Sequence, residues 1–288
     1  MTFINQECDV RLYIRESLAA YTGAGRVLRR EEQIRINQAI GSCGFSMLNL
    51  GAYLSGANDE EKGATVFAVQ STRKLSRTEY SITINDEAGA GFAIANGINS
   101  ASLVMSVSET MNVRRFGITR TVSFRQLKAV AAVLKSGGVM TDLQLSTVFG
   151  CPFEGKMNDG IVLQLIDYFC LLGIDGVTLR DSSGAASPTE TAALCRRLRQ
   201  DYPHLTITLH LSDATGRAAQ NTCAAAGEGV TRFGLTGREL AVSGSMNMKH
   251  LIETSLKYIA EVEHYGFTTE IDTEKLGQVS EYALLTEV

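Results

Sequence analysis

The chain has 288 residues, enough to bury the core of one large α/β barrel or of two ordinary domains. Charged residues make up 20% of the sequence and the formal net charge is -4. This balance excludes the basic field expected for nucleic-acid binding and the polybasic run expected at a membrane surface, so we expect a small-molecule partner.

Short apolar segments alternate with longer segments of helical period along the chain. Eight segments are predicted to be strands, at residues 10–16, 45–53, 80–84, 102–108, 141–150, 176–181, 206–213 and 231–237. Eight alternations without a proline- or serine-rich linker predict one domain over residues 1–288, folded as an α/β protein of the (β/α)8 TIM-barrel type. A doubly wound open sheet is the alternative.

Apolar residues at helical spacing predict buried helix faces between these strands. Two such faces are formed by Ile36, Ala39, Ile40 and Cys43, and by Val162, Leu165, Ile166 and Phe169. Ser187, Pro188 and Glu190 match the N-cap, the first position and the capping-box position of another helix. Further helices are predicted to begin near Gly216 and after Asn247. The C-terminal extension from about residue 266 is predicted to form a final helix on or beside the barrel.

The cysteines and the N-terminal residues bear on the cellular compartment. Six cysteines are spread along the chain without a CxxC pair or a short cysteine–histidine spacing, which favours reduced thiols over a disulfide or zinc framework. Residues 1–16 reach charged side chains too early for a signal peptide, and no run of eighteen apolar residues occurs. We therefore expect a soluble, cytoplasmic protein.

Polar residues at the C-terminal ends of the predicted strands are the candidates for chemistry, because the βα loops of a barrel carry the active site. They are Arg15, Glu16, Asn49, Asn85, Asp86, Ser108, Glu109, Asn112, Cys151, Glu154, Arg180, Asp181, His210, Ser212, Asp213, Arg238, Glu239 and Asn247. Carboxylates, an imidazole and an amide at one mouth would suit a divalent cation such as Mg²⁺ or Mn²⁺. The alternative is that these loops are simply solvated.

His210 lies where an apolar strand changes to a polar turn. Leu209 and Leu211 alternate with Thr208, His210 and Ser212, so the histidine is predicted to face away from the leucines. Its imidazole is either a metal or substrate ligand or a strand histidine that is hydrogen-bonded to a neighbouring loop.

Four segments resemble signatures of 3-hydroxy-3-methylglutaryl-CoA (HMG-CoA) lyase and its relatives, the DRE-TIM metallolyases. They are SETMNVRR (108–115), STVFGCPFEGK (146–156), GVTLRDSSGAASP (176–188) and HLSDATGRAAQN (210–221). Their order and spacing follow the family, and the resemblance covers about residues 9 to 263. The resemblance implies a TIM-barrel enzyme that breaks or makes a carbon–carbon bond next to a carbonyl with the help of a divalent metal. It also implies a homodimer.

The resemblance also assigns roles to residues at the ends of the first and sixth strands. Arg15 matches the arginine that steadies the enolate, and Glu16 stands where the family has a metal-binding aspartate. Asp181 matches a retained aspartate, expected to act as an acid or base or to hold a water molecule. Arg180, expected to bind substrate, stands where the family has a glycine.

The remaining assignments concern the metal site and its surroundings. His210 keeps one half of a metal-binding histidine pair, and Ser212 replaces the other half and is expected to bind substrate. Asn247 matches a ligand asparagine, so the implied metal ligands are Glu16, His210 and Asn247; Asn247 would also suit the N-cap of the last long helix.

Two further positions depart from the lyase pattern. Asn49 replaces a glutamate and is expected to contact substrate, and Arg238 replaces the reactive cysteine and is expected to supply positive charge. Arg238 and Glu239 could instead form a solvated pair. Cys151 is expected to shape the mouth, as in the family, because no histidine is evident to activate its thiol.

Three functions follow as hypotheses. The first is a carbon–carbon lyase or condensing enzyme, distinct from strict HMG-CoA lyase, that acts on a small carboxylate or its CoA thioester through a metal-stabilised enolate. The second is a metal-independent aldolase, decarboxylase or isomerase that uses Arg15 and Arg238. The third is a non-catalytic ligand-binding or partner subunit, whose mark would be a site plugged by Arg180 or Arg238.

Overall fold

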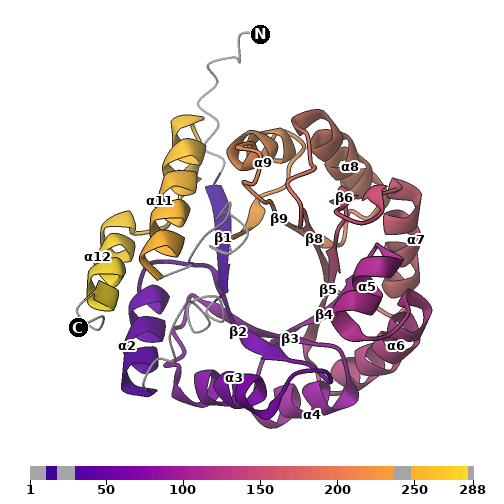
Figure 1. Cartoon of the computed structure of the whole chain (residues 1–288), viewed down its shortest axis with the longest axis horizontal. Helices are drawn as coiled ribbons and strands as arrows, with labels where there is room; N and C mark the ends of the chain where they lie inside the picture. The colour runs from indigo at the N-terminus through magenta and orange to yellow at the C-terminus, as the bar shows by residue number, and fades with distance from the viewer. Residues whose placement is uncertain (1–10, 18–29, 236–247, 285–288) are drawn as a thin grey trace.

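The computed structural model of the chain describes residues 11–17, 30–235 and 248–284. Within these ranges a closed barrel is formed by β1 (Arg11–Ser17), β2 (Met47–Tyr53), β3 (Glu79–Ile84), β4 (Ser100–Ser106), β5 (Met140–Ser146), β8 (Gly176–Arg180), β9 (Thr206–His210) and β10 (Arg232–Leu235). Neighbouring strands are parallel, and β10 pairs with β1 to close the sheet (Figure 1). The predicted TIM barrel is therefore confirmed, and the open sheet is excluded.

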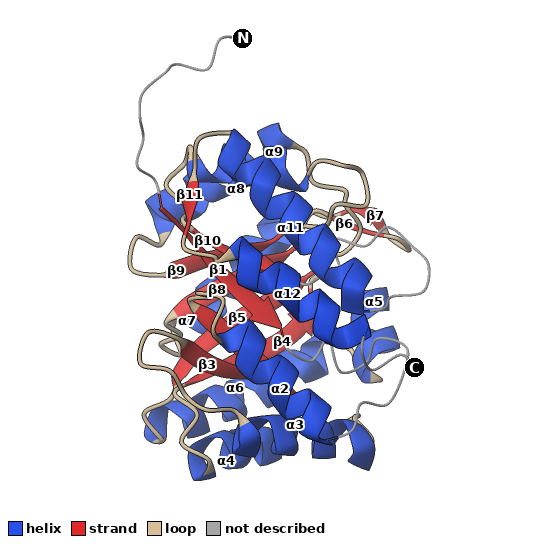
Figure 2. Cartoon of the chain, turned by 90° about the vertical axis from the view of Figure 1, so that its left-hand side faces the viewer, coloured by secondary structure: helices blue, strands red, loops and turns tan. Residues whose placement is uncertain are grey.

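Helices surround the barrel on its outside (Figure 1). They are α2 (Arg30–Gly41), α3 (Asp59–Ser71), α4 (Glu87–Ala95), α5 (Glu109–Phe116), α6 (Arg120–Ser136), α7 (Asp159–Cys170), α8 (Pro188–Asp201), α9 (Ala218–Ala226), α11 (Met248–His264) and α12 (Thr273–Leu284). As predicted, Ser187 caps α8, and its hydroxyl accepts the backbone N–H of Glu190 at 3.3 Å. The final helix, α12, packs against α11 and α2 on one side of the barrel (Figure 2).

Two short features were not predicted. The segment expected to continue as a strand to residue 150 leaves β5 at Ser146 and returns as a hairpin of β6 (Gly150–Cys151) and β7 (Gly155–Lys156). In the C-terminal extension, β11 (Thr268–Thr269) pairs with the first residues of β1. A two-residue strand carries no periodicity, so the sequence alone could not reveal it.

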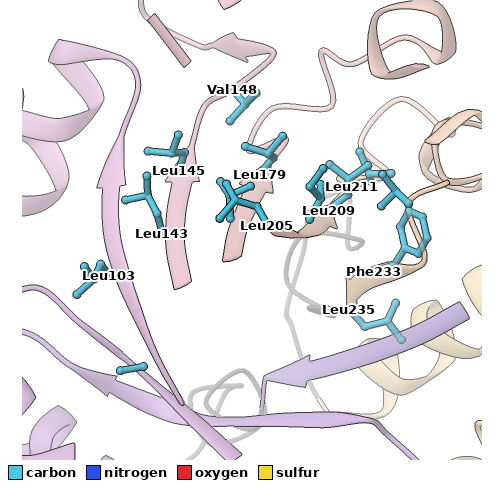
Figure 3. Packing of buried hydrophobic residues seen from close by; sticks show 14 of the residues in the cluster. Leu103, Leu143, Leu145, Val148, Leu179, Leu205, Leu209, Leu211, Phe233 and Leu235 are labelled. Atoms are coloured by element: carbon cyan, nitrogen blue, oxygen red, sulfur yellow. The ribbon is translucent and has the colours of Figure 1, made fainter. Parts of the chain in front are cut away.

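Apolar strand residues pack outward against the helices. Along β5, Leu143 and Leu145 are fully buried and alternate with Asp142 and Gln144. The leucines share one apolar cluster with helix residues such as Ile166 of α7, and Figure 3 shows leucines of several strands in this layer. Since alternate residues of a strand face opposite sides, the polar residues of β5 face the barrel interior.

The barrel interior is accordingly polar. Ser102 and Thr178 both donate to Oδ2 of Asp142, at 3.3 and 2.7 Å, and so link β4, β5 and β8 across the interior. Hydrogen bonds of this kind compensate for the removal of polar groups from water. Among the described helices, none is both long enough and apolar enough to cross a bilayer.

Candidate active site

The β6–β7 hairpin forms part of the rim at the C-terminal end of the barrel, and it is fastened to the start of α5. The Cys151 thiol donates to the Ser108 hydroxyl at 3.1 Å, and Glu154 accepts the backbone N–H of Thr110 at 2.6 Å. The guanidinium of Arg114 lies 4.1 Å from the ring centroid of Phe153. Cys151 therefore helps to hold the hairpin against the signature segment 108–115, at the rim of the barrel.

The β8–α8 loop joins this hairpin to the next loop of the rim. The Ser183 hydroxyl donates to the Gly150 carbonyl at 3.2 Å, and the Thr215 hydroxyl donates to the Gly184 carbonyl at 3.0 Å. The amide of Asn221 donates to the Ala186 carbonyl at 3.1 Å. Hydrogen bonds thus join all four signature segments into one rim.

Thr147 is a rim residue that the sequence analysis missed. Its φ of 59° lies in the left-handed region, which is costly for a β-branched residue. Its buried hydroxyl lies 2.7 Å from the Ser106 hydroxyl and accepts the backbone N–H of Ser108 at 3.2 Å. Its own N–H donates to Ser182 at 3.2 Å. These contacts, from residues 106–108 and from the β8–α8 loop, hold the strained turn that leads into the β6–β7 hairpin.

Asp181 is fully buried directly after β8, and its carboxylate organises its own loop. One oxygen accepts the backbone N–H of Ser183 at 3.4 Å and of Ala185 at 3.1 Å, and the other accepts that of Ala186 at 3.1 Å. Burial raises the pKa of Asp181, and these N–H donors oppose the rise. These hydrogen bonds give Asp181 a loop-holding role, and its predicted part as an acid or base or as a water holder stays a prediction.

Replacing Asp181 with alanine is expected to destabilise the fold by about 3 kcal/mol, because three backbone N–H groups would lose their acceptor in a buried loop. Asp181→Asn is the matched control, since its amide keeps one oxygen acceptor and nearly the same volume, and a smaller loss is expected. Urea unfolding of both variants measures the difference. Equal stability of Asp181→Ala and the parent chain would contradict this role.

Asn49 is held by neighbouring residues of the chain. Its amide nitrogen donates to the hydroxyls of Ser81 and Thr83 of β3, both at 3.2 Å, and its oxygen accepts the N–H of Gly51 at 3.2 Å. These contacts use both amide protons and the oxygen at a β-bulge between β2 and β3. The structure therefore places Asn49 in the barrel wall, and its predicted contact with substrate stays a prediction.

A cationic side chain and an imidazole occupy neighbouring strand ends. Arg180, the last residue of β8, is in register with His210, the last residue of β9. His210 is in turn in register with Gly234 of β10, and Gly234 with Arg15 of β1. His210 is 7% exposed and lies on the interior face, opposite to Leu209, as predicted.

The side chains that the structure describes do not by themselves fit a divalent cation. His210 offers one nitrogen, while the Ser212 hydroxyl accepts the N–H of Ala214 at 3.3 Å and is a weak ligand. Both oxygens of Asp181 accept N–H groups of its loop. Within the described residues there is also no cluster of three or more histidine, cysteine, aspartate or glutamate side chains with metal-binding geometry.

Several predicted site residues lie wholly or partly outside the described part of the chain. Arg238 and Asn247 fall in the range 236–247. Arg15 and Glu16 belong to β1, whose backbone and register are described, but their side chains lie outside the description. The predicted roles of these four residues stay predictions.

The comparison with protein families and curated proteins gives a consistent result. The model of the HMGL-like family matches residues 22–282. The chain is similar to a hydroxymethylglutaryl-CoA lyase of Bacillus subtilis, with 30% identity over 223 residues that cover 76% of this chain and 68% of the relative. It is also similar to the (R)-citramalyl-CoA lyase of Chloroflexus aurantiacus, with 28% identity over 166 residues that cover 58% and 52% of the two chains.

Solved structures share the fold. The Bacillus subtilis HMG-CoA lyase superposes with a TM-score of 0.83 at 22% identity, covering 96% of this chain and 94% of that one. The Acinetobacter baumannii HMG-CoA lyase, solved with coenzyme A and 3-methylmalate, gives a TM-score of 0.81 at 24% identity, covering 97% and 91%. At this level of identity the likeness extends to the barrel architecture.

Proposed function

Since the chain belongs to the HMGL-like family, whose similar members are carbon–carbon lyases, we propose that it breaks or makes a carbon–carbon bond in a carboxylate-bearing acyl-CoA or a related small carboxylate. This bond joins C2, the carbon next to the thioester carbonyl, to the hydroxyl-bearing C3, and C2 becomes part of the enolate. A function distinct from strict HMG-CoA lyase is proposed because the reactive cysteine, one metal histidine and the second-strand glutamate of that pattern are replaced by Arg238, Ser212 and Asn49.

The observation that carries this proposal is the pairing of Arg180 with His210 at the mouth of the barrel. The two residues end neighbouring strands in register and lie at the edge where TIM-barrel enzymes place their chemistry. A guanidinium binds a carboxylate or an oxyanion through two parallel N–H groups, and an imidazole can take and return a proton. The pair thus brings anion binding and proton transfer to one place.

In the cleavage direction a base takes the proton of the 3-hydroxyl group. The hydroxyl oxygen then forms a carbonyl, the bond between C2 and C3 breaks, and its electron pair passes into the thioester as an enolate. The enolate takes a proton at C2 to give the shorter thioester. We assign the proton transfers to His210 and the stabilisation of the negative oxygen to Arg180 and Arg15, with Arg238 as a further source of positive charge.

A divalent metal would supply Lewis-acid polarisation of the substrate oxygens. The described donor set does not fit such an ion, and a site would depend on Glu16 and Asn247. Activity that is lost in a metal chelator and restored by Mn²⁺ would support an enolate stabilised by a metal on Glu16, His210 and Asn247, whereas activity retained in the chelator would support stabilisation by arginine side chains. Metal analysis of the purified protein belongs to the same test.

The experiment that tests this function is a turnover screen read by mass spectrometry. The protein is incubated with HMG-CoA, citramalyl-CoA, other 3-hydroxyacyl-CoA thioesters that carry a second carboxylate, and 2-oxo acids together with acetyl-CoA, each with chelator and with Mn²⁺. Thermal shift in parallel reports binding, because a ligand of the folded state raises the unfolding temperature. The expected product is a shorter CoA thioester from cleavage, or a longer one from condensation of acetyl-CoA with a 2-oxo acid. If no compound reacts and none raises the unfolding temperature, the result would support the non-catalytic alternative.

Assembly and location are part of the proposal. A homodimer is implied by the resemblance, and light scattering should then give twice the chain mass of 31.1 kDa. We also propose a cytoplasmic location, because the six cysteines are spread along the chain without a CxxC pair, and fractionation of cells expressing the tagged protein tests it.

A further inference from the structure

We propose that Gly234 is a positioning residue: the absence of a side chain at this point of β10 lets the imidazole of His210 lie across that strand, toward β1. The geometric part of this inference stands independently of the enzymatic activity. Its catalytic consequence rests on the proposed function, in which His210 transfers protons.

The first argument is the space that the imidazole occupies. A Cβ atom placed on Gly234 would lie closer than 3.0 Å to Nε2, Cδ2 and Cε1 of His210, a separation that real Cβ atoms essentially never show. Nε2 would be the nearest of the three. Nε2 is the ring atom farthest from the His210 Cβ. The far part of the imidazole therefore fills the space beside the Cα of Gly234.

The second argument is that the backbone does not require glycine at this position. Gly234 is absent from the residues with positive φ, and it sits within a parallel strand in register with both neighbours. An alanine could adopt the same backbone conformation without strain. The need for glycine is therefore one of space, and the residue that takes the space is His210.

The third argument is the direction in which the ring extends. His210 ends β9, Gly234 is its register partner in β10, and Arg15 is the register partner of Gly234 in β1. An imidazole that lies across Gly234 carries Nε2 from β9 toward β1. A side chain on β10 would block this path and turn the ring back toward β9. Gly234 thereby leaves open the path along which the imidazole extends toward β1.

Gly234→Ala is expected to displace the ring and to lower kcat by about 100-fold, because an error of about 1 Å in a catalytic group costs that much. Two readouts do not depend on activity. The first is the Cε1–H resonance of His210, which is one of four histidine signals and is identified by its loss in His210→Ala. The second is the midpoint of unfolding in a double-mutant cycle of Gly234→Ala with His210→Ala.

The expected result is that Gly234→Ala shifts the His210 resonance and lowers the midpoint of unfolding, whereas it changes the midpoint little in the His210→Ala background. Gly63→Ala in α3 is the control, because a Cβ there meets no atom within 4 Å, and it should leave the His210 resonance unchanged.

An unchanged His210 resonance in Gly234→Ala, or equal destabilisation in both backgrounds, would overturn the inference. If Gly234→Ala does not fold, the double variant must fold, and its failure to do so would overturn the inference as well. A chain that passes these tests but turns over no thioester would refute the proposed function and leave the positioning role of Gly234 intact.

Discussion

Arg180→Gln is expected to lower kcat/KM for the CoA thioester by about 100- to 1,000-fold, the usual cost of removing one donor to an oxyanion in a preorganised site. Glutamine keeps a polar side chain of moderate length but loses the positive charge and the planar fork of N–H donors. Because Arg180 ends β8 beside His210, the loss should fall on the negative charge that develops during the reaction. Steady-state kinetics with the thioester selected by the screen measures it.

Two companion variants separate charge from geometry at this position. Arg180→Lys keeps the charge but not the fork, so an intermediate loss is expected. Arg180→Gly introduces the residue that the family pattern has here, and it should lower kcat/KM at least as much as Arg180→Gln, because it also removes the charge. Activity of Arg180→Gln within about five-fold of the parent enzyme would show that the charge acts elsewhere, since a donor to the oxyanion is worth far more.

His210→Gln is expected to lower kcat by about 1,000-fold, since general acid–base catalysis by a positioned side chain contributes about that factor. Glutamine retains hydrogen-bonding groups at similar reach but cannot take up a proton. If His210 only bound substrate, KM would rise and kcat would change little. The split between kcat and KM therefore distinguishes proton transfer from binding.

The matched control is His204→Gln. His204 is exposed and precedes β9, at the end of the strand opposite to the mouth, whereas His210 is buried at the C-terminal end of the same strand. We expect unchanged kcat and KM for His204→Gln. A comparable loss for both substitutions would mean that the effect comes from the stability of β9 and not from catalysis.

Periodicity predicted most of the fold from the sequence. Each barrel strand carries alternating or continuous apolar residues, and these pack into the layer between sheet and helices that Figure 3 shows. The cap at Ser187 was also predictable, because the hydroxyl of an N-cap satisfies the N–H of Glu190 locally. Such features depend on neighbours in sequence, which a single chain reveals.

Features that depend on contacts between distant residues were not predictable in this way. Thr147 takes a left-handed conformation only because Ser106, Ser108 and Ser182 hold it. β11 forms only because β1 offers a free pairing position. Neither is encoded in a local pattern, and both arise from tertiary structure overriding local preference.

The candidate site shows the same division. Arg180 and His210 were predicted to lie at the C-terminal ends of their strands, where barrel enzymes carry their active sites, and the structure places both there. Their register with each other follows from the pairing of β8 with β9. The use of both Asp181 oxygens by backbone N–H groups depends on the path of the loop that follows, which no residue pattern states. Gly234 was passed over because a glycine in a strand gives no signal of which ring fills its space.

Cleavage of the selected thioester in heavy water tests the proposed enolate most directly. The enolate takes its proton at C2, so the shorter CoA thioester should carry one deuterium on the carbon next to its carbonyl, and Arg180→Gln should lower the yield per unit time. Mass spectrometry of the CoA products reads both. Formation of free CoA by hydrolysis of the thioester, with no shorter thioester from any substrate of the panel, would contradict the assignment of a carbon–carbon lyase.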